Sequence, residues 1–243
     1  MRIRSGTKGF ILCSLMILLT FFGGTAFGAT AKVEADAVLE YNPSSFTIGP
    51  SDVPYYDYGM WSYNGGRVNN IKLSGTNHSK TSITTEGTQQ HGMVADSEGS
   101  EAWNYGPIST SGSTAYGMWG TDGAEIHNAS EWLKYDRVWF SDQYKWFTGS
   151  IQTTGQGSHG MVAEGGAQAF NEGALNLSIT PFGIDPKRAS ITTNGDAAHG
   201  MVAYGEGSAV WNAGDILTKG VGSFGLLAED GGVAHNYAQD TAS

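Results

Sequence analysis

The chain has 243 residues with 36 glycines, one cysteine and a formal net charge of −10. One cysteine excludes a fold held by disulfides, and the acidic balance argues against a surface that neutralises nucleic-acid phosphates. A high glycine content without a collagen period is typical of a β fold with many corners.

The first 31 residues are typical of a secretory signal peptide. Arg2, Arg4 and Lys8 precede an apolar run at 10–22, and small residues follow as a cleavage site. The apolar run of 13 residues is short for a membrane span. Removing the three basic residues from 13 leaves 10 against 23 acidic ones, a net charge of −13. The sequence therefore predicts export from the cytoplasm.

Residues 32–56 lie outside the repeat that follows, and we interpret them as an N-terminal cap over its first open edge. From 57 to 243 the chain repeats a unit with three parts. The first part is a glycine followed by methionine or leucine, at Gly59, Gly92, Gly117, Gly160, Gly200 and Gly225. The second ends on an asparagine 11 or 12 residues later, at Asn70, Asn104, Asn128, Asn171, Asn212 and Asn236. The third is Ile-x-Thr-x-Gly, beginning at Ile83, Ile108, Ile151, Ile191 and Ile216.

Three short alternating segments between glycine-rich turns, in about 25 residues, suit one coil of a parallel β-helix. A β-propeller blade needs roughly 40 residues and four strands, which this unit does not supply. We predict an all-β fold, a right-handed parallel β-helix with apolar ladders inside. The asparagines are predicted to form a structural amide ladder at one corner, each bonding to the next.

The insertions that lengthen some units all fall at the same position of the repeat unit. The step from the asparagine to the next isoleucine is 4 residues in the two short coils and 13, 23 and 20 in the others. All three insertions therefore leave from the same corner, which in a solenoid is often the binding face.

Aromatic residues are concentrated in the second insertion, 129–150. An exposed ring cluster marks a surface for a partner or a glycan, whereas a loop folded back on the solenoid wall would bury the same rings. The predicted ligand-binding residues are Trp132, Tyr135, Arg137, Trp139, Phe140, Tyr144 and Trp146.

Two other sets of side chains have both a functional and a structural interpretation. His91, His159 and His199 share a repeat position with Tyr58, Tyr116 and Phe224, so we predict a stack of rings rather than a metal site. The acidic residues after the first strand suit either the paired carboxylates of a polysaccharide hydrolase or turn chemistry and solubility. They are Asp96, Glu98, Asp122, Glu164, Glu206, Glu229 and Asp230. We predict no catalytic residue, metal or cofactor.

The units HGMVADSEGSEAWNYG, HGMVAEGGAQAFNEG and HGMVAYGEGSAVWNAG resemble coils of the pertactin-like passenger domains of Gram-negative autotransporters. The resemblance covers 57–243 and implies a cell-surface or shed protein, commonly an adhesin or virulence factor. It also implies an outer-membrane β-barrel translocator at the C-terminus. No alternating segments of that kind follow the repeat, so we expect an incomplete β-helix, periplasmic if no barrel is present.

These observations predict a non-enzymatic adhesin or display stalk that binds a host or neighbouring-cell protein or glycan through loops at one corner. One alternative is a β-helix polysaccharide hydrolase or lyase. Another is a structural stalk fragment without activity of its own.

Overall fold

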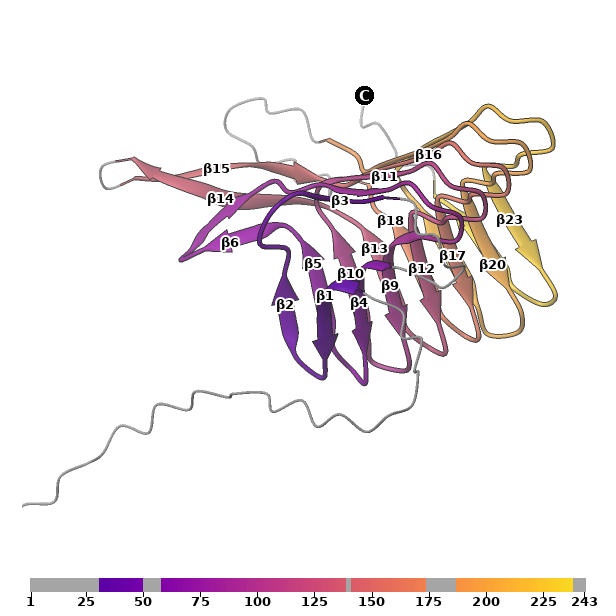
Figure 1. The fold of residues 1–243 in the computed structure, drawn as a ribbon, viewed down its shortest axis with the longest axis horizontal. Helices are drawn as coiled ribbons and strands as arrows, with labels where there is room; N and C mark the ends of the chain where they lie inside the picture. The colour runs from indigo at the N-terminus through magenta and orange to yellow at the C-terminus, as the bar shows by residue number, and fades with distance from the viewer. Residues whose placement is uncertain (1–30, 50–57, 139–140, 174–186, 238–243) are drawn as a thin grey trace, which may run out of the picture.

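The computed structural model describes residues 31–49, 58–138, 141–173 and 187–237, and in these every element is a β-strand. Three parallel sheets form the faces of a coil that winds along one axis, and each coil contributes one strand to each sheet (Figure 1). No helix in these ranges is long and apolar enough to cross a bilayer. The predicted signal peptide lies outside the described residues except for Ala31.

Each sheet collects one part of the repeat. Sheet 1 holds β1 (Ala31–Asp36) and the strands of the Gly-Met or Gly-Leu part: β4 (Tyr58–Tyr63), β9 (His91–Asp96), β12 (Met118–Thr121), β17 (Met161–Glu164), β20 (Met201–Tyr204) and β23 (Leu226–Glu229). Sheet 2 holds β2 (Leu39–Tyr41) and the strands that end on asparagine: β5 (Arg67–Asn70), β10 (Glu101–Asn104), β13 (Glu125–Asn128), β18 (Gln168–Asn171), β21 (Ala209–Asn212) and β24 (Val233–Asn236). Sheet 3 holds β3 (Phe46–Ile48) and the Ile-x-Thr strands: β8 (Ile83–Thr85), β11 (Pro107–Thr110), β16 (Ser150–Thr153), β19 (Ser190–Thr193) and β22 (Asp215–Thr218).

Equivalent residues of successive coils lie in register. Met118 pairs with Met161, Ile151 with Ile191, and the asparagines pair with one another along sheet 2. Because strands in a sheet are about 4.8 Å apart, like side chains stack directly on like. The predicted right-handed parallel β-helix is confirmed.

The core consists of columns of stacked side chains from all three sheets. Methionines of sheet 1, isoleucines of sheet 3 and small aliphatic residues of sheet 2 are almost fully buried and form one cluster. The opening glycines let the corner between sheets 3 and 1 close tightly. A Cβ at Gly160 would lie 2.3 Å from Cγ2 of Ile191 and 2.5 Å from the carbonyl oxygen of Gly200. The glycine in the motif is therefore a packing requirement.

The segment predicted as a cap begins as one more coil. β1, β2 and β3 pair in parallel with β4, β5 and β8, the three strands of the first predicted coil. Asn42 even extends the amide ladder by donating to Oδ1 of Asn70. Residues 31–48 thus cover the first repeat by continuing its geometry.

The insertions leave from the corner between sheet 2 and sheet 3, as the spacing predicts. The first is the short hairpin of β6 (Lys72–Ser74) and β7 (Asn77–Ser79), between β5 and β8. The second is the long hairpin of β14 (Ser130–Val138) and β15 (Ser141–Thr148), between β13 and β16. Both project on the same side of the β-helix (Figure 1). Residues 174–186 of the third insertion lie outside the described residues.

Candidate functional site

The long hairpin carries the predicted ligand-binding residues. β14 and β15 pair antiparallel, with Trp132 opposite Trp146, and the register shifts between Lys134 and Asp136. An irregular register bends and twists a strand pair locally. Tyr135 lies at this irregularity, near the outer half of the hairpin.

The hairpin is neither wholly buried nor wholly exposed. Phe147 at its base is fully buried and packs with Ile71, while Tyr135 and Tyr144 are 38% and 46% exposed. Arg137 is exposed, and Trp146 is half-buried. The ammonium of Lys145 lies 4.6 Å from the ring centre of Tyr135. The hairpin is therefore buried at its base and exposed further out.

Not every predicted residue can be placed in this way. Trp139 and Phe140 lie outside the described residues, and Trp132 is placed by its backbone alone. Of the seven predicted residues, the structure brings Tyr135, Arg137, Tyr144 and Trp146 together on one hairpin.

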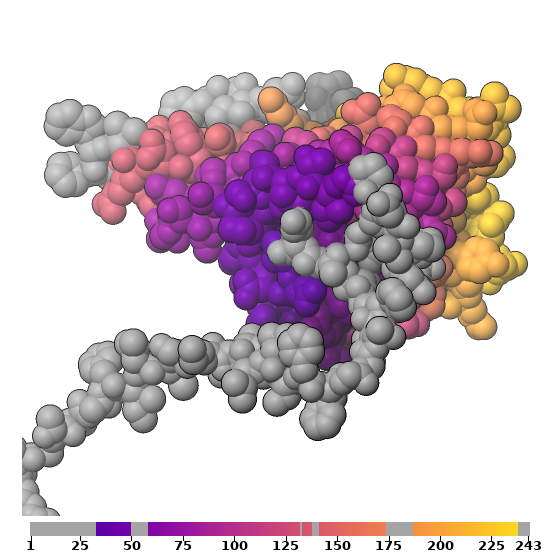
Figure 2. Space-filling view, in the orientation of Figure 1, coloured from indigo at the N-terminus to yellow at the C-terminus, as the bar shows by residue number. Residues whose placement is uncertain are grey.

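The two hairpins brace each other. Nδ1 of His78 lies 2.9 Å from the carbonyl oxygen of Lys134, and Nζ of Lys134 donates to Oγ1 of Thr76 at 3.1 Å. Lys134 also forms a 2.8 Å ion pair with Asp142, and its hydrogen bond lowers the pKa of that carboxyl group. Figure 2 shows the long hairpin lying against the short one and extending beyond the coils. These contacts join the outer part of the long hairpin to the short one.

The asparagines form a continuous column at the root of the insertions. Each side-chain amide donates to the next carbonyl oxygen, at 2.7 Å from Asn70 to Asn104 and at 2.9 Å from Asn104 to Asn128 and from Asn128 to Asn171. The column continues to Asn212 and Asn236. This column gives each buried side-chain amide a hydrogen-bond partner and joins the coils at the corner from which the hairpins leave.

The three histidines lie in a stack of rings along sheet 1. His159 stacks on His199 at 4.9 Å between centroids, with Tyr116 and Phe224 as the outer neighbours of that pair. Nδ1 of His159 accepts the backbone N–H of His199 at 3.0 Å, which is the geometry of a neutral ring with its proton on Nε2. Burial lowers the pKa of His159 to about 4, and the charge of His199 adds to that change. These imidazoles are neutral at pH 7. In the part of the chain that the structure describes, no group of three or more His, Cys, Asp or Glu side chains could hold a metal ion.

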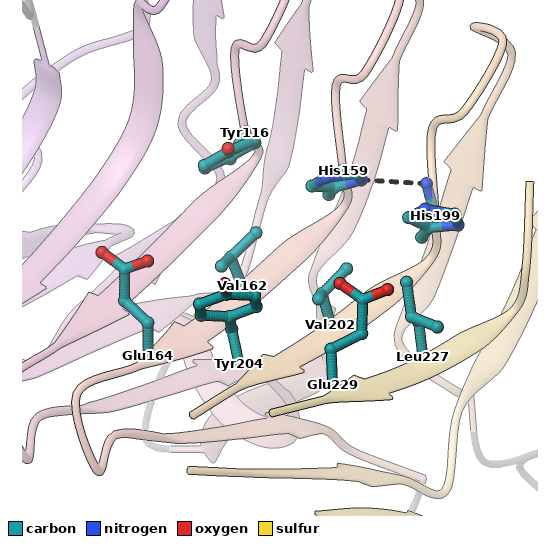
Figure 3. Close-up of a pocket in the computed structure, with 9 residues that line it drawn as sticks. All are labelled: Tyr116, His159, Val162, Glu164, His199, Val202, Tyr204, Leu227 and Glu229. Atoms are coloured by element: carbon teal, nitrogen blue, oxygen red, sulfur yellow. Dashed lines mark hydrogen bonds between the residues drawn. The ribbon is translucent and has the colours of Figure 1, made fainter. Parts of the chain in front are cut away.

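A groove of about 340 Å³ runs beside this stack on the outer face of sheet 1. The lining residues form three rows over coils 3 to 6 (Figure 3). One wall is Tyr116, His159 and His199, the floor is Val162, Val202 and Leu227, and the other wall is Glu164, Tyr204 and Glu229. Sequence reasoning singled out the histidines and acids separately but did not bring them together.

Two side chains of the wall that holds the carboxylates, Glu164 and Tyr204, have raised pKa values. Burial raises the pKa of Glu164, a hydrogen bond from Trp119 opposes this change, and the charge of Asp122 adds to it. The hydroxyl of Tyr204 hydrogen-bonds to Asp230, which raises the pKa of Tyr204. Asp122 and Asp230 themselves adopt positive φ angles of 52° and 50°, the turn geometry expected of short polar residues. No lysine or arginine is among the residues that line the groove.

A second column of rings, on the outer face of sheet 2, was missed by sequence reasoning. Its members occupy the position before the last five of the six repeat asparagines: Trp103, His127, Phe170, Trp211 and His235. Trp103 and His127 are 3.8 Å apart at an interplanar angle of 7°. The signal that could have revealed the column is the recurrence of planar residues at that position. The rings cover one another's faces, so the column stabilises the stacking of coils.

Together these features define a parallel β-helix protein with one elaborated corner and one grooved face. A protein-family model described as the BigA third pectate lyase-like domain matches residues 146–237. This stretch includes the last three coils and most of the groove, and it is similar to that domain. Comparisons with curated proteins and with solved structures gave no match.

Proposed function

We propose that this chain is the passenger of an exported, autotransporter-like surface protein that adheres through its elaborated corner. The observation that carries the proposal is the pair of mutually braced hairpins on one side of a regular β-helix, with Tyr135 and Tyr144 exposed on the longer one. The predicted signal peptide and the resemblance of the coils to pertactin-like passengers also support a location at the cell surface.

The two parts of the molecule suit the two parts of this role. Coils that pair with both neighbours along three sheets make a stiff support, because the strands of successive coils are hydrogen-bonded in register. Exposed tyrosines give a large contact area at small entropic cost, and Arg137 adds a planar cation to the same hairpin. The partner is a protein or glycan on a host or neighbouring cell, bound without chemical conversion.

Binding of the purified full chain to a panel of glycans and matrix proteins tests this proposal. The test variant replaces residues 129–150 by a three-residue link, which is the length found between Asn104 and Ile108. A second variant carries Tyr135→Ser and Tyr144→Ser, and Tyr237→Ser removes an equally exposed ring from the far end as a control. We expect the first two to lose at least one of the ligands that the wild type binds, and the control to keep all of them. Unchanged binding after hairpin replacement would refute the corner as the adhesive site, and no binding by any chain would leave a stalk without activity of its own.

A second candidate function is polysaccharide cleavage, favoured by the words pectate lyase-like in the description of the matching domain. Glu164 and Glu229 on one wall of the groove are the carboxylates that such a reaction would use. Incubation with polygalacturonate and with neutral glucans, followed by measurement of new chain ends, tests it. Cleavage that Glu164→Gln abolishes would establish the enzyme, and the absence of new ends with every substrate would exclude these substrates.

A further inference from the structure

The groove on sheet 1 exists because one repeat position changes its residue along the chain. This position, directly after the methionine or leucine, points outward and holds Trp61, Val94, Trp119, Val162, Val202 and Leu227. In coils 1 and 3 an indole fills the space beside the ring stack: Trp61 lies 5.8 Å from Tyr58, and Trp119 lies 5.1 Å from His91. Val94 of coil 2 lies between these two indoles in the sheet register. From coil 4 onward smaller aliphatic residues leave that space open.

The floor of the groove is apolar and closely flanked. Val162 and Val202 are only 4% and 5% exposed, because the side chains of both walls rise beside them. A volume of about 340 Å³ lies at the lower end of the range for small-molecule sites. The space therefore suits a short segment with one apolar face.

One wall of the groove offers hydrogen-bond donors and the other offers acceptors, and neither wall carries a positive charge. His159 and His199 each accept a backbone N–H at Nδ1, so the group that either ring can offer a ligand is the Nε2–H donor. Glu164 and Glu229 on the facing wall offer acceptors. A ligand between the walls must accept hydrogen bonds on one side and donate on the other.

We infer that this groove binds an uncharged glycan, with its hydroxyl groups bridging the histidine and glutamate walls and a sugar face on Val162 and Val202. A hydroxyl group accepts and donates at the same atom, whereas each polar group of a peptide backbone does only one of these. Sugar rings also present an apolar face between their polar edges. The site lies on a different face from the adhesive hairpin and does not depend on it.

The charge of the groove disfavours polyanions, and the distance between its two carboxylates excludes a metal ion as the ligand. A polyanion would meet two carboxylates and no cation, so binding would be repelled. Glu164 pairs with Tyr204 and Tyr204 with Glu229, so the two carboxylates are two coils apart, about 9.6 Å at the usual strand spacing. Ligands of one calcium ion lie at most about 5 Å from each other, so the pair does not form a metal site.

The test measures binding of the full chain to an array of neutral glycans beside uronate-bearing and sulfated ones. Val202→Trp fills the groove with the residue that the chain itself uses at this position, and Leu217→Trp places the same indole on exposed sheet 3 as a control. His199→Phe keeps a stacking ring and removes the donor, with His91→Phe as its control outside the groove. Circular dichroism and urea midpoints verify folding, and if Val202→Trp does not fold, His199→Phe decides.

We expect neutral glycans to bind the wild type and both controls, and to bind Val202→Trp and His199→Phe at least tenfold more weakly. A hairpin-replaced chain should retain this binding, which separates the groove from the adhesive corner. Wild-type affinity in both groove variants, a preference for acidic glycans, or no neutral glycan bound by the wild type would each overturn the inference.

Discussion

The amide ladder makes a quantitative prediction at Asn128. This residue is fully buried, accepts from Nδ2 of Asn104 at 2.9 Å, and donates to Oδ1 of Asn171 at 2.9 Å and to the carbonyl oxygen of Ser190 at 3.1 Å. Asn128→Ala would leave a donor on Asn104 and an acceptor on Asn171 without partners inside the corner. Each such buried group costs about 1–3 kcal/mol, so the predicted loss of stability is about 4 kcal/mol.

The last rung of the same ladder provides the control. Asn236 is exposed and accepts one bond from Asn212 at 2.8 Å, so water can replace its side chain. Asn236→Ala should cost only about 1 kcal/mol.

Urea unfolding followed by far-ultraviolet circular dichroism distinguishes the two variants. With a slope of about 2.5 kcal/mol per molar urea, Asn128→Ala should lower the midpoint by about 1.6 M and Asn236→Ala by about 0.4 M. Equal midpoints for both variants would show that the buried ladder bonds do not carry this stability, and would refute the reasoning.

Three further predictions concern the ring stack, the corner glycine and the hairpin base. Burial lowers the pKa of His91 from 6.5 to about 3, so the unfolded chain takes up a proton first as pH falls. The stabilisation that neutral His91 gives the folded chain is complete above about pH 6.5, falls progressively towards pH 3, and is smaller by about 2 kcal/mol at pH 5. The urea midpoint of His91→Tyr should therefore fall less between pH 7 and pH 5 than that of the wild type, and an equal fall in both would contradict this prediction. Gly160→Ala should lower thermal stability far more than Gly225→Ala, whose new Cβ meets only Cγ2 of Ile216 at 3.8 Å, and equal melting temperatures would count against the close-packing argument. Phe147→Ala should cost about 3–5 kcal/mol at the hairpin base and speed hydrogen exchange in β14 and β15, and unchanged exchange there would argue against the buried anchor.

The fold was predictable because a stacked architecture places equivalent residues in contact. The spacing of glycine, asparagine and Ile-x-Thr along one chain was enough to predict three sheets, the amide ladder geometry and a single corner for insertions. The coil formed by residues 31–48 was not predicted. Its strands lack the motif, and pairing with β4, β5 and β8 needs only compatible backbone edges.

The candidate sites were less accessible to sequence reasoning. A cluster of rings at 129–150 indicated a surface, but the division between buried Phe147 and exposed Tyr144 depends on packing against Ile71, 76 residues away from Phe147. The groove depends on Val202 being smaller than the indole of Trp119 at the same position. Such a void arises where equivalent residues differ between coils, and a search for the repeat finds only the residues that the coils share.

The account depends most directly on successive coils lying in register, since the ladder, the ring stack and the groove all follow from it. Thr84 and Ser109 are partners on neighbouring strands of sheet 3, and Gln152 is one coil further. Adjacent partners are about 4.8 Å apart, within the range for a disulfide, whereas Thr84 and Gln152 are about 9.6 Å apart and beyond it. Peptide mapping of oxidised double-cysteine variants should therefore find a disulfide in Thr84→Cys/Ser109→Cys and none within Thr84→Cys/Gln152→Cys. Efficient bridging of the second pair, or failure of the first in a folded chain, would contradict the β-helix described here.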